Sequence, residues 1–250
     1  MKYVAGNREG LGSRLKCLIS VMRLNGKPLL YWEKNGKLNC KWGDLFENSF
    51  KTIRRPHKKD PGFDVYYSWR WKTTTNERRK WGLKYYDFMY HDTPKSLRSG
   101  ILKQINQLKP VECVRNEIDT FKRQFSKNTI SVCVRTWKDV VGSPKERRFD
   151  LKEVTQTVDK NIKSNIFLTS DSVQVYHEFV GRYGKNNVLY YPKRTGWGDR
   201  HSTKGMQDTL VELYLAGLNR KMFITWHSAF TECQWWFGGG KAEVTEMVKW

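Results

Sequence analysis

The amino-acid sequence predicts an α/β fold of two lobes, each built on a parallel β-sheet. Two observations carry this prediction. Short apolar strands alternate with segments of helical spacing, and the first strand runs through a glycine-rich turn into a helix, as a Rossmann-like unit does. The chain has 250 residues, with 11 Trp, 12 Tyr and 12 Phe. This aromatic content excludes a disordered chain, and the length suffices for two hydrophobic cores.

The first lobe is expected to span residues 1–125. Apolar residues alternate or recur at helical spacing in most of it, but the stretch 52–94 is rich in Lys, Arg, Trp and Tyr without clear periodicity. We therefore expect irregular loops with short elements in that stretch. The elements expected elsewhere are a strand at 2–5, a glycine-rich turn at 6–12, a helix at 13–24, a strand at 29–32 and helical segments within 96–125.

The second lobe is expected to span residues 126–250 and to alternate regularly between strands and helices. Runs of apolar and β-branched residues mark its strands, and apolar side chains three or four residues apart mark its helices. Strands are expected at 130–134, 165–169, 187–191 and 221–225, and helices at 151–163, 173–183, 206–218 and 230–237.

The net charge of +21 is concentrated in the first lobe. Residues 1–125 hold 27 of the 46 Lys and Arg residues but 12 of the 25 acidic ones, so they carry +15 of the total. Such a field attracts nucleic acid, phosphorylated substrates or an anionic membrane face, and charge alone does not choose among them. The five cysteines form no CxxC pair, and no signal peptide or transmembrane segment is visible. We expect a cytoplasmic protein, in some settings peripheral to a membrane.

Polar clusters follow three strands of the second lobe. They are Arg135 to Asp139, Ser170-Asp171 and Trp226-His227-Ser228. Ligands of open α/β sheets bind beyond the carboxyl ends of the strands, so these clusters predict a binding site. The alternative for each is a capping or turn residue, and Ser170 and Asp171 would suit the cap of the following helix.

Two further features admit both a functional and a structural explanation. Gly10-Leu11-Gly12 is either a turn that lets the backbone approach a sugar or phosphate, or a simple tight turn; it is no dinucleotide fingerprint, because Leu15 replaces the third glycine. Glu212 lies among apolar residues and is either buried with a partner or on a solvent-facing side of its helix. No DxD, HExxH, Walker motif or histidine spacing indicates a metal.

The ordered motifs resemble a family of GDP-fucose-dependent fucosyltransferases, of the nodulation-type and core α-1,6 kind. The resemblance begins with Gly6 to Leu15 and Trp42-Gly43-Asp44-Leu45-Phe46. It continues through Cys133-Val134-Arg135, where the family has His-x-Arg, and Thr169-Ser170-Asp171. It ends with Arg200 to Gly205, Val211 to Ala216 and Thr225 to Phe230.

The resemblance implies a GT-B-like fold, two Rossmann-like lobes with a cleft between them, and an inverting, metal-independent transfer without a cofactor. The partners it implies are a nucleotide sugar, normally GDP-fucose, and a glycan or glycoprotein acceptor; the basic first lobe adds an anionic surface as a candidate partner. The donor-binding residues would be Gly10, Gly12, Arg135, Ser170, Asp171, Arg200, Glu212 and Ser228, with Arg135 catalytic. A general base could be Asp139 or Glu146, and nothing in the sequence selects between them.

Two departures from the family pattern leave alternatives open. Cys133 stands in place of the histidine and Thr136 in place of a second arginine. The same scaffold could therefore use another donor, as a xylosyl-, rhamnosyl- or hexosyltransferase. The charge leaves a second alternative, a basic nucleic-acid-binding protein without enzymatic activity.

Overall fold

The protein is described here by a computed structural model. It describes residues 2–25, 27–54, 63–66, 71–72, 76, 79, 85–86, 93–137, 148–160, 165–194, 196 and 199–248. The chain forms two compact units: unit 1 comprises Met1–Glu112 and His201–Gln207, and unit 2 comprises Cys113–Arg200 and Asp208–Trp250. The chain thus passes into unit 2 earlier than residue 125, and a short later segment returns to unit 1.

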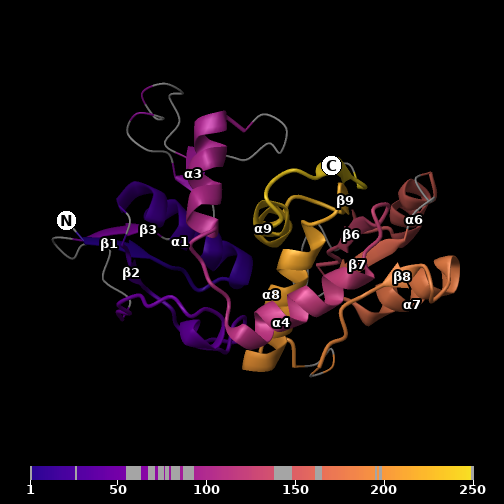
Figure 1. Cartoon of the computed structure of the whole chain (residues 1–250), viewed down its shortest axis with the longest axis horizontal. Helices are drawn as coiled ribbons and strands as arrows, with labels where there is room; N and C mark the ends of the chain where they lie inside the picture. The colour runs from indigo at the N-terminus through magenta and orange to yellow at the C-terminus, as the bar shows by residue number, and fades with distance from the viewer. Residues whose placement is uncertain are drawn as a thin grey trace. The chain divides into compact units, whose positions relative to one another are not determined.

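Unit 1 contains a parallel sheet in the order β2-β1-β3 (Figure 1). Its strands are β1 (Lys2–Ala5), β2 (Leu29–Leu30) and β3 (Phe63–Tyr66), with a separate antiparallel pair, β4 (Trp71–Lys72) and β5 (Tyr85–Tyr86). Strand β3 lies in the stretch for which we expected irregular loops with short elements. It is only four residues long and includes Asp64, so the sequence signal for a strand is weak there.

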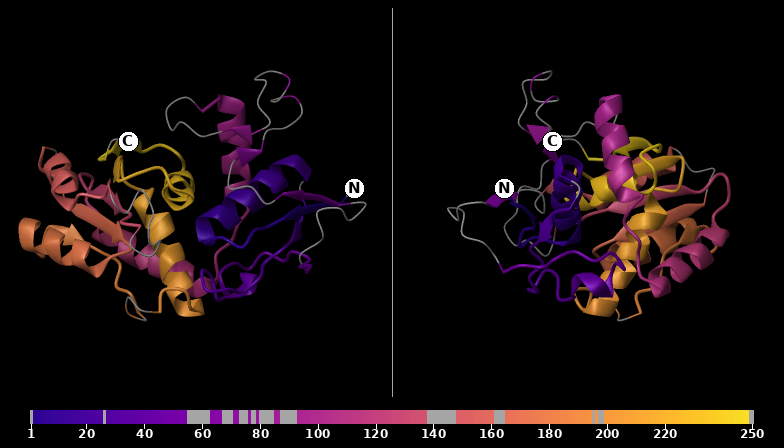
Figure 2. Two further views of the ribbon diagram at one scale, coloured as in Figure 1. Left: turned by 180° about the vertical axis from the view of Figure 1, so that it is seen from behind. Right: turned by 60° about the vertical axis from the view of Figure 1, so that its left-hand side comes forward.

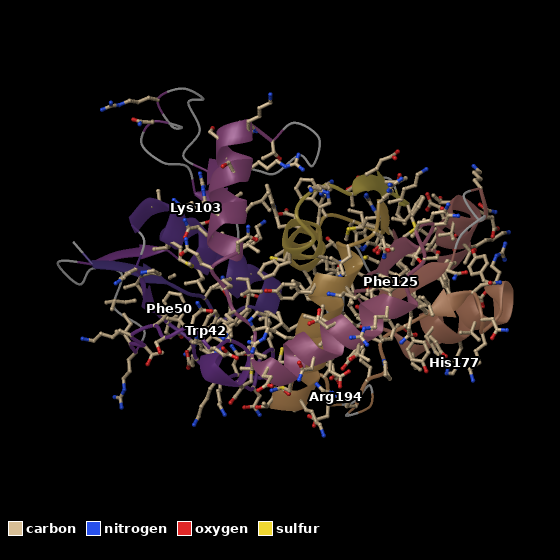
Figure 3. All side chains as sticks on the ribbon, viewed as in Figure 1. Trp42, Phe50, Lys103, Phe125, His177 and Arg194 are labelled. Carbon is tan, nitrogen blue, oxygen red and sulfur yellow. The ribbon has the colours of Figure 1, made fainter. Side chains whose placement is uncertain are left out.

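Helix α1 (Leu11–Asn25) follows β1 and starts two residues earlier than predicted. Helix α3 (Lys95–Ile105) packs against α1, and Figure 1 and Figure 2 show the two helices side by side. The short helix η1 (Trp42–Asp44) contributes Trp42 to an aromatic cluster. The ring centroid of Trp42 lies 4.4 Å from that of Phe46, on which it stacks, and 5.3 Å from that of Phe50, which it meets edge to face; Trp42 and Phe50 are labelled in Figure 3. This cluster supplies apolar contacts to a unit whose strands are short.

Unit 2 contains a five-stranded parallel sheet in the order β10-β9-β6-β7-β8. The strands are β6 (Ile130–Val134), β7 (Ile166–Ser170), β8 (Val188–Leu189), β9 (Lys221–Ile224) and β10 (Glu243–Glu246). All five residues of β6 are buried, as expected for a central strand covered on both faces. Strand β10 was not predicted. It lies at the sheet edge and has charged, exposed ends, so it lacks the apolar run that marks the other strands.

Helices connect the strands of unit 2 in the predicted alternation. They are α6 (Leu151–Asp159), α7 (Val173–Tyr183), α8 (Thr203–Ala216), whose residues 203–207 belong to unit 1, and α9 (Ala229–Phe237). Helices α4 (Glu112–Phe121) and η2 (Lys122–Gln124) precede β6. The core between sheet and helices includes Val132, Leu168, Phe179, Phe223 and Trp226. None of the helices in the described ranges is long and apolar enough to cross a bilayer.

Candidate functional site

The strand order of unit 2 defines where a ligand would bind. Strand β6 comes first in the sequence, β7 and β8 extend the sheet on one side of it, and β9 and β10 extend it on the other. The direction of winding therefore reverses between β6 and β9. Open α/β sheets bind their ligands at such a switch point, beyond the carboxyl ends of the strands. Arg135 follows the end of β6 directly.

Arg135 and Asp171 lie side by side because their strands are in register. Val134 of β6 pairs with Ser170 of β7, so the next residue on each strand reaches the same edge of the sheet. Asp171 Oδ2 accepts a hydrogen bond from Arg135 Nη1, and Oδ1 accepts one from the backbone N–H of Thr136 at 2.9 Å. One carboxylate thus orders both the arginine side chain and the backbone that follows it.

The backbone of Arg135 is held from the other side of the switch point by β9. Its N–H donates to Thr225 Oγ1 at 2.9 Å, and its carbonyl oxygen accepts from Trp226 Nε1, also at 2.9 Å. The side chain nevertheless remains 27% exposed. Arg135 is therefore a fixed cation with solvent access, which is what an anion-binding residue requires.

Arg200 is also brought to this edge of the sheet. Its Nη1 donates to the backbone carbonyl oxygen of Asp171 at 3.3 Å. Three of the predicted donor-binding residues, Arg135, Asp171 and Arg200, therefore form one hydrogen-bonded group. Thr225 was not among the predicted site residues, although it directly follows β9 and begins the resembling segment Thr225 to Phe230.

Two predicted serines make local backbone contacts in the structure. Ser170 Oγ accepts from the N–H of Ser172 at 3.1 Å, and Ser228 Oγ accepts from the N–H of Thr231 at 3.1 Å and so caps α9. The capping explanation thus holds for Ser228, but it is wrong for Ser170 and Asp171, because the N-cap of α7 is Ser172. Its contact with a donor phosphate stays a prediction, and so does the donor role of Ser170.

Glu212 is buried in α8, at 5% exposure, so the solvent-facing alternative is wrong. Its Oε2 accepts from Lys193 Nζ. One turn earlier, the fully buried Asp208 accepts hydrogen bonds from Arg194 Nε at 2.5 Å and from the backbone N–H of Arg194 at 2.9 Å. Burial raises the pKa of Glu212, Asp208 adds to this effect, and the Lys193 charge opposes it.

Lys193 and Arg194 were not among the predicted site residues. They follow Pro192, shortly after β8, and so lie beyond the carboxyl end of a parallel strand just as Arg135 does. The rule that selected the other three clusters would have selected them too.

The two predicted glycines lie in unit 1. The carbonyl oxygen of Gly10 accepts from the N–H of Arg14 at 3.2 Å, and Gly12 is inside the first turn of α1. A Cβ at Gly10 would meet nothing within 4 Å, so the fold does not require glycine there. Asp139 and Glu146, the two candidates for the catalytic base, lie outside the described residues. In the described part of the chain, no group of three or more His, Cys, Asp or Glu side chains could hold a metal ion.

Comparison with solved structures identifies the fold. The NodZ α-1,6-fucosyltransferase soaked with GDP-fucose matches with a TM-score of 0.60 and 16% identity, over 98% of this chain and 94% of that one. The Bradyrhizobium fucosyltransferase NodZ matches with a TM-score of 0.57 and 15% identity, over 98% and 95%. NodZ co-crystallised with GDP matches with a TM-score of 0.56 and 15% identity, over 98% and 94%. The chain has the fold of these fucosyltransferases.

The likeness extends over almost the whole length of both chains and confirms the predicted α/β, GT-B-like fold class. At the sequence level no family model matches the chain, and no curated protein matches it. The fucosyltransferase fold is therefore carried here by a strongly diverged sequence.

One divergence lies in β6, two residues before Arg135. Cys133, where the resembling family has histidine, is buried in β6, and this burial raises the pKa of its thiol to about 12. The thiol therefore stays protonated and neutral near neutral pH. Cys133 therefore contributes no charge at this position of β6.

Proposed function

We propose that the chain is a glycosyltransferase that binds a nucleotide sugar, GDP-fucose in the first instance, at the β6–β9 switch point of unit 2. It transfers the sugar to a hydroxyl of a glycan or glycoprotein acceptor. The observation that carries the proposal is Arg135, fixed through Asp171 and Thr225 but still exposed. The NodZ structures with GDP-fucose and with GDP, which share the fold, support this choice of donor.

The proposed reaction is a single displacement with inversion. The acceptor oxygen forms a bond to the anomeric carbon of the sugar while the bond from that carbon to the diphosphate oxygen breaks. The acceptor proton passes to a base, for which Asp139 and Glu146 are the candidates, and the nucleoside diphosphate leaves. Negative charge accumulates on the diphosphate, so a fixed cation next to it lowers the barrier.

Arg135 is suited to this task without a metal ion. A guanidinium carries five N–H groups in a planar fork, so one side chain can bind a carboxylate and a phosphate together. Because Asp171 and the backbone contacts fix the arginine beforehand, little reorganisation is needed as the charge develops. We propose Ser170, Arg200, Glu212 and Ser228 as further donor contacts in unit 2, and Gly10 and Gly12 stay sequence-based predictions.

The test is turnover of sugar nucleotides by the wild type and by Arg135→Ala. We expect hydrolysis or transfer with GDP-fucose, and a roughly 100- to 1,000-fold slower rate in the variant. Arg182→Ala is the matched control, because Arg182 is also an arginine of unit 2 paired with an aspartate, Asp159, but on the outside of α7. Near-normal turnover by folded Arg135→Ala would rule out the assignment.

Thr136, which stands in place of the second arginine of the resembling family, leaves one alternative open, a different donor on the same scaffold. A panel of GDP-, UDP- and dTDP-sugars separates this alternative from a GDP-fucose enzyme by the sugar nucleotide that is consumed. Salt-dependent binding of nucleic acid together with no thermal shift from any sugar nucleotide would point to a basic binding protein instead.

A further inference from the structure

Trp137 lies against the arginine of the candidate site. The guanidinium carbon of Arg135 is 5.2 Å from the centroid of the Trp137 indole. A cation over an aromatic face at this distance is attracted by the negative face of the ring, and tryptophan gives the strongest such contact. The two residues are separated in the chain by Thr136 alone, whose N–H is held by Asp171.

The backbone of Trp137 adopts an unusual conformation. Its φ is 60°, and it is the one non-glycine residue in the described ranges with a positive φ. A bulky side chain rarely adopts this left-handed conformation, because its Cβ crowds the following carbonyl oxygen. Surrounding contacts must therefore hold Trp137 in place, and its ring does pack against the core of unit 2. Strained backbone conformations of this kind occur most often at active sites and ligand-binding sites.

We propose that Trp137 is a positioning residue for Arg135. The left-handed turn places the indole against the guanidinium and limits the rotamers that the arginine side chain can adopt. Arg135 is then already aimed when a diphosphate arrives, so less side-chain freedom is lost on binding. The proposal rests on the proposed function for its ligand, whereas the contact between the two side chains can be tested without any ligand.

Variants at Trp137 separate the aromatic contact from the backbone conformation. Asparagine adopts a positive φ readily but has no ring, whereas phenylalanine keeps a ring in the same conformation. With GDP and inorganic pyrophosphate as calorimetric probes, we expect Trp137→Asn to weaken both by about 3- to 30-fold, the range that a cation–π contact spans. Trp137→Phe should restore most of this loss. Tyr183→Asn is the control, because the Tyr183 ring centroid lies 5.9 Å from the guanidinium carbon of Arg182 on α7, and this variant should leave the affinity for both probes unchanged.

A double-mutant cycle decides between positioning and packing. If Trp137 acts through Arg135, Trp137→Asn has no further effect on affinity in an Arg135→Ala background. An equal loss in both backgrounds would overturn the proposal. If the wild type binds neither probe, the proposed function fails, and the same cycle measured on the free energy of unfolding still tests the contact. A significant coupling between positions 135 and 137 supports it, and additive effects refute it.

Discussion

The carboxylate of Asp171 binds the side chain of Arg135 through one oxygen, and its other oxygen accepts the N–H of Thr136. Arg135 and Asp171 are 36 positions apart in the chain, and they are adjacent in space because β6 and β7 are parallel and in register. This contact joins the ends of two strands at the edge where α/β proteins bind ligands. It gives the candidate site a fixed arginine rather than a mobile surface charge.

Replacing Asp171 tests the contact that orders Arg135. We expect Asp171→Asn to lower turnover of the sugar nucleotide by about tenfold, because a charge-assisted hydrogen bond contributes about 1.5–3 kcal/mol. Affinity for GDP should change less, since removing a negative charge beside the phosphates offsets the loss of order. Steady-state kinetics measure both effects. Asp159→Asn, which removes an exposed aspartate–arginine pair on α6 and α7, should leave turnover unchanged.

The buried pair of Arg194 and Asp208 should contribute strongly to the stability of unit 2. Asp208 is fully buried, so Arg194→Met leaves a buried carboxylate without its guanidinium partner. We expect this to lower the free energy of unfolding by about 3–5 kcal/mol. Urea denaturation measures the loss. Lys37→Met breaks the exposed pair with Glu9 in unit 1 and should have little or no effect. Equal effects of the two variants would contradict the burial of Asp208.

Glu212 should make the stability of the protein depend on pH. Burial raises the pKa of Glu212 in the folded state above its ordinary value of 4.5, so the folded protein binds this proton more tightly than the unfolded chain does. Stability from this group is then complete below about pH 4.5 and is lost as the pH rises through the folded pKa.

The matched variant is Glu212→Gln, which cannot titrate. Unfolding free energies of both proteins between pH 4 and pH 8 should show the wild type losing stability relative to the variant as the pH rises. A wild type that instead gains relative stability with rising pH would mean that the Lys193 charge dominates and lowers the pKa of Glu212.

Two glycines of unit 1 should respond differently to alanine. A Cβ at Gly6 would clash with the backbone carbonyl oxygen of Tyr31, so Gly6→Ala must displace the backbone directly after β2 and should lower the melting temperature clearly. Gly10→Ala meets nothing within 4 Å and should leave the melting temperature unchanged. If Gly10 contacts the donor as the sequence predicts, its variant stays folded but binds GDP-fucose more weakly. Unaltered binding would remove Gly10 from the site.

The sequence predicted the part of the site that depends on regular structure. Val132 and its apolar neighbours mark a central strand, and from that strand the positions of Arg135 and Asp171 at one sheet edge follow. The burial of Glu212 was open, because its apolar neighbours are compatible with either side of a helix. Only the packing of α8 decides it, and Lys193 as its partner comes from a loop 19 residues away in sequence.

Other features were beyond sequence reasoning for physical reasons. Nothing local in Trp137 favours a positive φ, which is imposed by contacts of the folded unit. The edge strand β10 has little apolar signal, since one side of it is not covered by another strand. Both features depend on contacts between residues far apart in the chain, and the local sequence pattern does not show those contacts.

Calorimetric titration of GDP into the wild type, Arg135→Ala and Arg182→Ala tests the central assignment most directly. We expect the wild type to bind GDP, Arg182→Ala to bind it equally well, and Arg135→Ala to bind it at least about tenfold more weakly, as loss of a charge-assisted phosphate contact implies. Equal affinity of wild type and folded Arg135→Ala would contradict the assignment of Arg135 as the ligand of the donor diphosphate.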